Sequence, residues 1–151
     1  MRFKIFCLLT LVLGWLCWAA APGISGAAES CRVSVDTILA ARDDSRIDPQ
    51  LKTDISELQS MFNYTSYRLL GRKSLNLGIG QSGTLSLPGD HSLRITPKQI
   101  RGSRADIALE MMKNQQTVFQ TRVQLLNRGN LFVGGPDFLT GNLIFKISSA
   151  Y

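Results

Sequence analysis

Residues 104–125, RADIALEMMKNQQTVFQTRVQL, decide the fold of this chain. Apolar and polar side chains alternate along 104–111 and again along 118–125, and the polar segment 113–116 separates the two runs. Alternation with a period of two is typical of β-strands that bury one face. Two such strands joined by a short turn predict an antiparallel hairpin in which 104–111 pairs with 118–125.

Turn sequences divide the rest of the C-terminal half into segments of strand length. Connections this short favour antiparallel neighbours, so we expect an antiparallel meander or sandwich of six or seven strands. The turn sequences lie at 78–83, 88–90, 101–102, 128–129, 134–136 and 140–142.

One helix interrupts the β pattern near the start, after a strand expected at 32–39. Asp48 and Pro49 are suited to the N-cap and the first turn of this helix, which we expect over residues 49–62. The chain is therefore predicted to be α+β and mainly β, with the amphipathic helix packed on a sheet face. The apolar stripe of the helix consists of Leu51, Ile55, Leu58 and Phe62.

The first 28 residues have the organisation of a secretory signal peptide. Arg2 and Lys4 precede the apolar run 5–21, and Gly26–Ala28 supply small residues at a cleavage site. We expect cleavage after Ala28, which leaves residues 29–151 as a single exported β-rich domain in the periplasm or cell envelope, with extracellular release as the alternative. Retention as a membrane anchor is the main competing interpretation, since the apolar run reaches the lower length limit of a spanning helix, and the small residues after the run favour cleavage.

Charge is unevenly divided after residue 28. Residues 29–63 carry a formal charge of −3, and residues 64–151 carry +7. Strand parity places several of the basic side chains outward, opposite apolar neighbours. We expect this surface to recognise a protein or an anionic component of the envelope, although a solvated face that only maintains solubility is the simpler interpretation. The basic residues concerned are Arg68, Arg72, Arg94, Lys98, Arg104 and Arg122.

Two further features could contact a protein partner. Phe138 and Leu139 follow the glycine turn 134–136 and would form a small apolar patch if exposed, whereas a loop that tucks the aromatic ring under the sheet is the alternative. An exposed edge strand could also pair with a strand of the partner, with the basic side chains supplying charge complementarity.

Signals for catalysis or cofactor binding are weak. GIGQSG at 78–83 matches a glycine-rich nucleotide-binding motif, but an alternating segment broken by proline follows where a helix should begin, so a turn is predicted. His91 is expected in an exposed turn and Cys31 in a frayed terminus, and they are the only residues of their types after residue 28. We therefore predict no metal site, cofactor or catalytic residue.

The favoured function is a non-catalytic binding or assembly module, and nucleic acid is not an expected partner. One alternative is a small outer-membrane β-barrel or membrane-embedded subunit, because segment 141–151 alternates, ends on an aromatic residue and so resembles the terminal strand of such barrels. About 123 residues that include a helix are few for its strands. The other alternative is a small secreted enzyme using Cys31 or a serine, for which no base can be named. Membrane association is not favoured, and homo-oligomer formation stays open.

Overall fold

The computed structural model describes residues 29–151, so the expected signal peptide at 1–28 lies outside the described residues. The fold is mainly β, as expected, with eight strands in residues 29–151 rather than six or seven. The elements are β1 (Ser30–Ala41), η1 (Pro49–Leu51), α1 (Ile55–Met61), β2 (Ser66–Gly78), β3 (Gly83–Leu87), β4 (His91–Arg101), β5 (Arg104–Lys113), β6 (Gln116–Leu126), β7 (Asn130–Phe138) and β8 (Gly141–Ala150).

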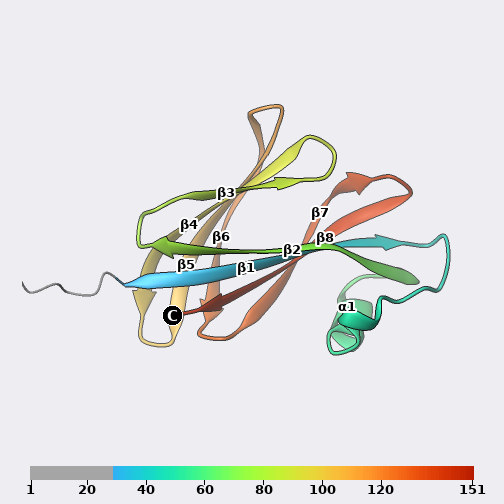
Figure 1. Cartoon of the computed structure of the whole chain (residues 1–151), viewed down its shortest axis with the longest axis horizontal. Coiled ribbons are helices and arrows are strands. Elements are labelled where there is room, and N and C mark those ends of the chain that lie inside the picture. Colours follow the sequence, from blue (N-terminus) through green and yellow to red (C-terminus); the bar gives the residue numbers. More distant parts are fainter. Residues whose placement is uncertain (1–28) are drawn as a thin grey trace, which may run out of the picture.

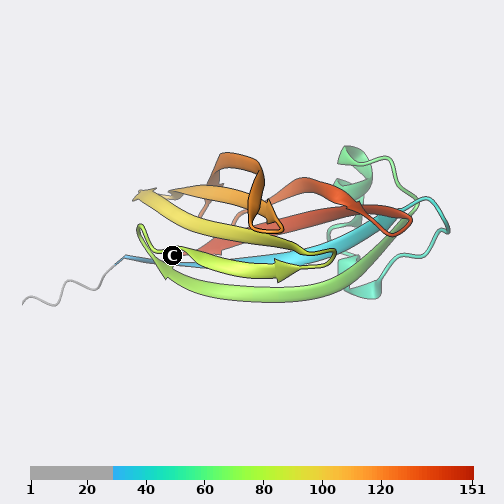
Figure 2. The ribbon, with the colours of Figure 1, turned by 90° about the horizontal axis from the view of Figure 1, so that it is seen from above.

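The strands form two antiparallel sheets of four. Sheet A has the order β2-β1-β8-β7, and sheet B has the order β3-β4-β5-β6. Sheet B is a meander, whereas sheet A places the first strand beside the last. β1 and β2 run along the long axis of the molecule, whereas β4, β5 and β6 are steeply inclined to it, and α1 lies at the end away from the C-terminus (Figures 1 and 2).

The hairpin predicted from residues 104–125 is confirmed as β5 and β6. Ile107 pairs with Val123, and Met111 pairs with Phe119. The two turn residues, Asn114 and Gln115, both have positive φ values, of 49° and 65°. Two consecutive left-handed residues match the turn whose twist suits a two-residue hairpin loop.

The main core lies between the two sheets. It combines inward-facing side chains of β1 and β8 with those of β4, β5 and β6. Cys31 belongs to this core and is fully buried, so the expectation of a frayed, exposed thiol is wrong. On β1 it pairs with Leu77 of β2, which is also part of this core, and burial raises the pKa of its thiol.

A second core forms where the helical segment covers the outer face of sheet A. Leu51 and Leu58 are fully buried there, and Ile55 and Phe62 pack at its margin, which confirms the apolar stripe. The helix itself is not continuous over 49–62: a short 3-10 turn, capped by Asp48, is followed by a separate helix beginning at Ile55. This cover buries β1 on both faces from Val35 to Ala41.

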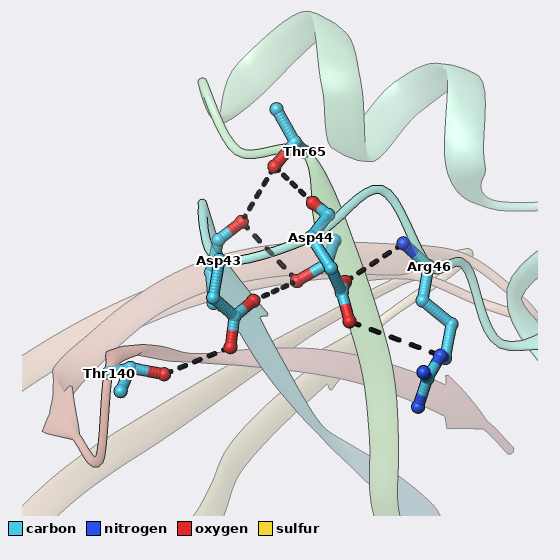
Figure 3. Close-up of polar contacts among 7 residues, drawn as sticks. Asp43, Asp44, Arg46, Thr65 and Thr140 are labelled. Atoms are coloured by element: carbon cyan, nitrogen blue, oxygen red, sulfur yellow. Dashed lines mark hydrogen bonds and ion pairs between the residues drawn. The ribbon is translucent and has the colours of Figure 1, made fainter.

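Hydrogen bonds fix the loop that leads from β1 to this helical segment. The carboxylate of Asp43 accepts hydrogen bonds from Ser66 Oγ at 3.0 Å and from Thr140 Oγ1 at 3.1 Å. Thr65 Oγ1 donates to the Asp44 carbonyl oxygen at 2.5 Å (Figure 3). The hydrogen bond from Ser66 is the main reason that the pKa of Asp43 is lowered. The loop after β1 is thereby joined to the start of β2 and to the turn before β8.

Among residues 29–151, no helix is long and apolar enough to cross a lipid bilayer.

Candidate binding surface

The outer face of sheet B carries five basic side chains, which we call the cationic face. Its members on β4 and β5 meet at the β4–β5 hairpin, where Arg101 pairs with Arg104. On β6, Arg122 pairs with Ala108 of β5. The chain neighbours of Ala108, Ile107 and Leu109, are buried, so Ala108 and Arg122 face outward. The outward parity predicted for Arg104 and Arg122 is thus confirmed. The cationic face consists of Arg94, Lys98, Arg101, Arg104 and Arg122.

A shallow, open depression of about 560 Å³ lies in this face. Ala108 sits in the row between Thr96 on β4 and Arg122 on β6. Because alanine has no side chain beyond Cβ, the longer side chains around it form a rim. Arg94, Lys98 and Arg122 all line this rim, so the structure brings together three of the predicted residues from two strands.

Most of the positive charge on the cationic face is not compensated. Arg94 Nη1 lies 3.0 Å from Glu110 Oε2, whose other oxygen accepts a hydrogen bond from Thr117 Oγ1 at 2.5 Å. The hydrogen bond from Thr117 is the largest cause of the lowered pKa of Glu110, followed by the influence of Arg94. Within residues 29–151, Lys98 and Arg122 form no ion pair. Their donors are therefore available to an anionic group.

Arg68 and Arg72 do not share this face, because both lie on β2 of sheet A. Nor do they lie on one side of β2, as parity predicted. The register shifts so that Leu69 pairs with Ile38 and Gly71 pairs with Thr37, which makes Leu70 an extra residue. This bulge turns Arg68 to the inner side of the edge strand and Arg72 to the outer side.

Arg72 is occupied by an ion pair on the outer face of sheet A. Its Nε and Nη2 atoms each lie 2.7 Å from a carboxylate oxygen of Asp36, which is buried. On the next strand, Lys146 Nζ lies 2.7 Å from both oxygens of Asp54. These two bidentate pairs compensate the basic groups at the centre of sheet A, so this face is a poorer candidate for binding an anion.

The two apolar candidates, Phe138 and Leu139, differ in their exposure to solvent. Phe138 is half-buried and packs against the main core, in agreement with the alternative in which the loop tucks its ring under the sheet. Leu139 is 77% exposed and has a positive φ of 52° in the turn before β8. A joint apolar patch of Phe138 and Leu139 is therefore not formed.

The positions of two residues in this region were not predicted from the sequence. Arg101 joins the cationic face only because a bulge between Pro97 and Gln99 changes the parity of β4. His91 was expected to be exposed but is 8% exposed, because it begins β4 and lines a groove with Phe119 and Pro136. The turn sequence around His91 gave no signal for this burial, since the groove comes from residues distant in the chain.

Residues 29–151 contain no group of three or more histidine, cysteine or acidic side chains that could hold a metal ion. The site is thus a surface of cations and hydroxyl or amide groups, suited to recognition of carboxylate, sulfate or phosphate groups. No protein-family model, curated protein or solved structure matches this chain.

Proposed function

We propose that residues 29–151 form a non-catalytic binding or assembly module that recognises a protein or anionic envelope component through the cationic face. The observation that carries this proposal is the placement of Lys98 and Arg122, without acidic partners among the described residues, on the rim of one depression. A cation that is already paired offers little to a ligand, whereas these two can pair with an incoming anion without breaking an internal contact.

The place of action is part of the proposal. It rests on the order of basic, apolar and small residues in 1–28, which is that of a secretory signal. Outside the cytoplasm, the anionic groups within reach include acidic proteins and envelope polymers. Fractionation of cells that express the full chain tests this part, and recovery of the protein in the cytoplasm with its first 28 residues intact would contradict it.

Charge reversal on the cationic face tests the binding surface. The double variant Lys98→Glu/Arg122→Glu is compared with Arg32→Glu/Lys52→Glu, which changes the net charge equally. Arg32 and Lys52 are exposed and lie on β1 and beside η1, away from sheet B. The assay measures the salt concentration that elutes each protein from immobilised poly-glutamate, and then capture of envelope components at low and high salt.

The proposal expects the sheet B variant to elute at clearly lower salt than the control variant, and to lose the salt-sensitive capture that the control retains. Equal losses in the two variants would show that only net charge matters, which is the simpler interpretation of a solvated face, and would refute a specific cationic face.

A further inference from the structure

The fold leaves four edge strands, and β6 is the least protected of them. Natural proteins guard exposed edges with short strands, prolines, bulges or charges. β3 has five residues, β7 contains Pro136 within a bulged register, and β2 carries three basic residues. β6 has eleven residues with no glycine, proline or acidic residue, and Arg122 is its only charge.

The free side of β6 is regular enough to accept another strand. Its one register shift is at Val118, and from Phe119 to Leu126 every residue keeps its partner on β5. In the described part of the chain, β5 is the only strand that pairs with β6. At the C-terminal end of β6 the Leu125 carbonyl oxygen accepts a hydrogen bond from Tyr151 Oη, and the Leu126 carbonyl oxygen accepts from Ser149 Oγ and the Gly129 N–H. The outward backbone N–H and C=O groups that can pair with an added strand are therefore those of residues 119–124.

An apolar groove runs beside this ladder on its inner side. Phe119 has the inward parity of its partner Met111, yet Phe119 is 44% exposed while Met111 is 4% exposed. Phe119 lies on the edge strand, and the bulged part of β7 lines the groove beside it without closing it. The groove of about 350 Å³ is lined by His91, Met111, Val118, Phe119 and Gly134–Pro136.

We propose that β6 binds an extended segment of a partner protein as an added strand. In this partner segment, an apolar residue and an acidic residue lie three positions apart. Phe119 and Arg122 point to opposite sides of β6 because three positions separate them. A residue opposite Phe119 would place its side chain in the groove, and the residue opposite Arg122 would face the outer side and pair with the guanidinium. This inference rests on the proposed function, since Arg122 also belongs to the cationic face.

A second copy of this chain is a poorer occupant of the same edge. The sequence of β6, QTVFQTRVQLL, contains no carboxylate that could pair with Arg122 across a two-fold axis. In an antiparallel pair centred on Phe119, Arg122 would lie opposite Gln116 of the other copy. Charge complementarity thus favours a different protein that supplies aspartate or glutamate.

The test uses synthetic peptides of about nine residues, the length of a long strand. The first peptide has one leucine and one glutamate three positions apart in a threonine and glutamine background, and the second has them four apart. The readouts are fluorescence polarisation of labelled peptide and hydrogen exchange of the β6 amides in the full chain. Analytical ultracentrifugation reports the oligomeric state.

We expect the first peptide to bind at least about fivefold more tightly than the second, and to slow exchange of β6 amides. Phe119→Ala should weaken binding, and its exposure makes the variant safe for folding. Arg122→Glu should abolish binding of the glutamate peptide, while a lysine in place of that glutamate should restore it. Equal binding of the two peptides, protection confined to β2 or β7, or dimer formation through β6 would each overturn the proposal.

The result of the peptide experiment can be distinguished from the result of the charge-reversal experiment that tests the proposed function. If the peptides do not bind while Lys98→Glu/Arg122→Glu still differs from its control on poly-glutamate, the added strand is refuted and the cationic face stands. If the peptides bind but those variants behave alike, the cationic face is refuted and the edge remains.

Discussion

Replacement of Lys146 by methionine should release the helical segment from sheet A. The ammonium group of Lys146 contacts both carboxylate oxygens of Asp54, each at 2.7 Å. Asp54 is the residue just before α1, so the pair joins the start of the helix to β8. Methionine keeps most of the apolar stem of lysine and removes only the charge and the donors.

The expected loss of stability follows from the burial of the pair. Removal of one partner from a fully buried ion pair costs about 3–5 kcal/mol, because the other charge is left without compensation. Here the side chains of Lys146 and Asp54 are 20% and 12% exposed, so water can reach the remaining carboxylate in part. We therefore expect Lys146→Met to lower the free energy of unfolding by about 2–3 kcal/mol, which for a domain of this size is roughly 6–15 °C in Tm.

Urea denaturation followed by circular dichroism measures the loss, with the m-value as a check on two-state behaviour. Arg122→Met is the matched control, because that side chain is exposed and unpaired, and it should change stability by less than about 0.5 kcal/mol. The double variant Asp54→Asn/Lys146→Met should regain part of the loss, since no unpaired charge remains. A loss below about 0.5 kcal/mol for Lys146→Met, or a double variant less stable than the single one, would refute this reasoning.

Three further outcomes are expected. Leu58→Ala should lower the free energy of unfolding by about 2–4 kcal/mol, read from the urea midpoint, since Leu58 is fully buried between α1 and sheet A; a loss under about 1 kcal/mol would mean that the helix is only loosely packed. Because Cys31 is buried and its pKa is raised, iodoacetamide should label it only after unfolding, as mass spectrometry can show, and rapid labelling of the native protein would contradict its place in the core. Thr117→Val should raise the pKa of Glu110 toward its ordinary value of 4.5, measured by NMR titration, because the Thr117 hydroxyl is the largest cause of its lowering. Since the folded pKa of Glu110 is lowered, ionised Glu110 stabilises the folded state above its unfolded pKa, and this contribution is lost as pH falls through the folded pKa. An unchanged titration of Glu110 in Thr117→Val would contradict the assignment of the lowered pKa to the Thr117 hydroxyl.

The sequence allowed prediction of features that depend on neighbouring residues. The alternation in 104–125 predicted the β5–β6 hairpin, and the stripe from Leu51 to Phe62 predicted the surface that packs on a sheet. Both signals are local, because side-chain periodicity is set by the geometry of one element. The break between η1 and α1 was not predictable in this way, since it places Asp54 against Lys146 of a strand 92 residues away.

Features that depend on irregular strand register or on contacts between distant strands were not predicted. The bulge at Leu70 separates Arg68 from Arg72, and the bulge after Pro97 brings Arg101 onto the cationic face. A single inserted residue reverses the facing of every side chain after it. Gly71 and Pro97 lie beside these insertions and are residue types found at bulges, but neither specifies which residue of its strand is the extra one. The burial of His91 has the same origin, because β6 and β7 supply the groove that covers it.

The uneven charge along the sequence corresponds to a difference between the two sheets in how basic side chains are paired. Asp36 and Asp54 belong to the acidic segment 29–63, and their partners Arg72 and Lys146 belong to the basic remainder. Both pairs lie on sheet A, because β1 and α1 are built into that sheet and its cover. Sheet B receives no acidic residue from segment 29–63, and its strands have only Asp106 and Glu110 to balance six basic side chains, the five of the cationic face and Lys113. The sheet that no helix covers thus carries positive charge that acidic residues of its own strands compensate only in part, which supports the proposal of a surface for an anionic partner.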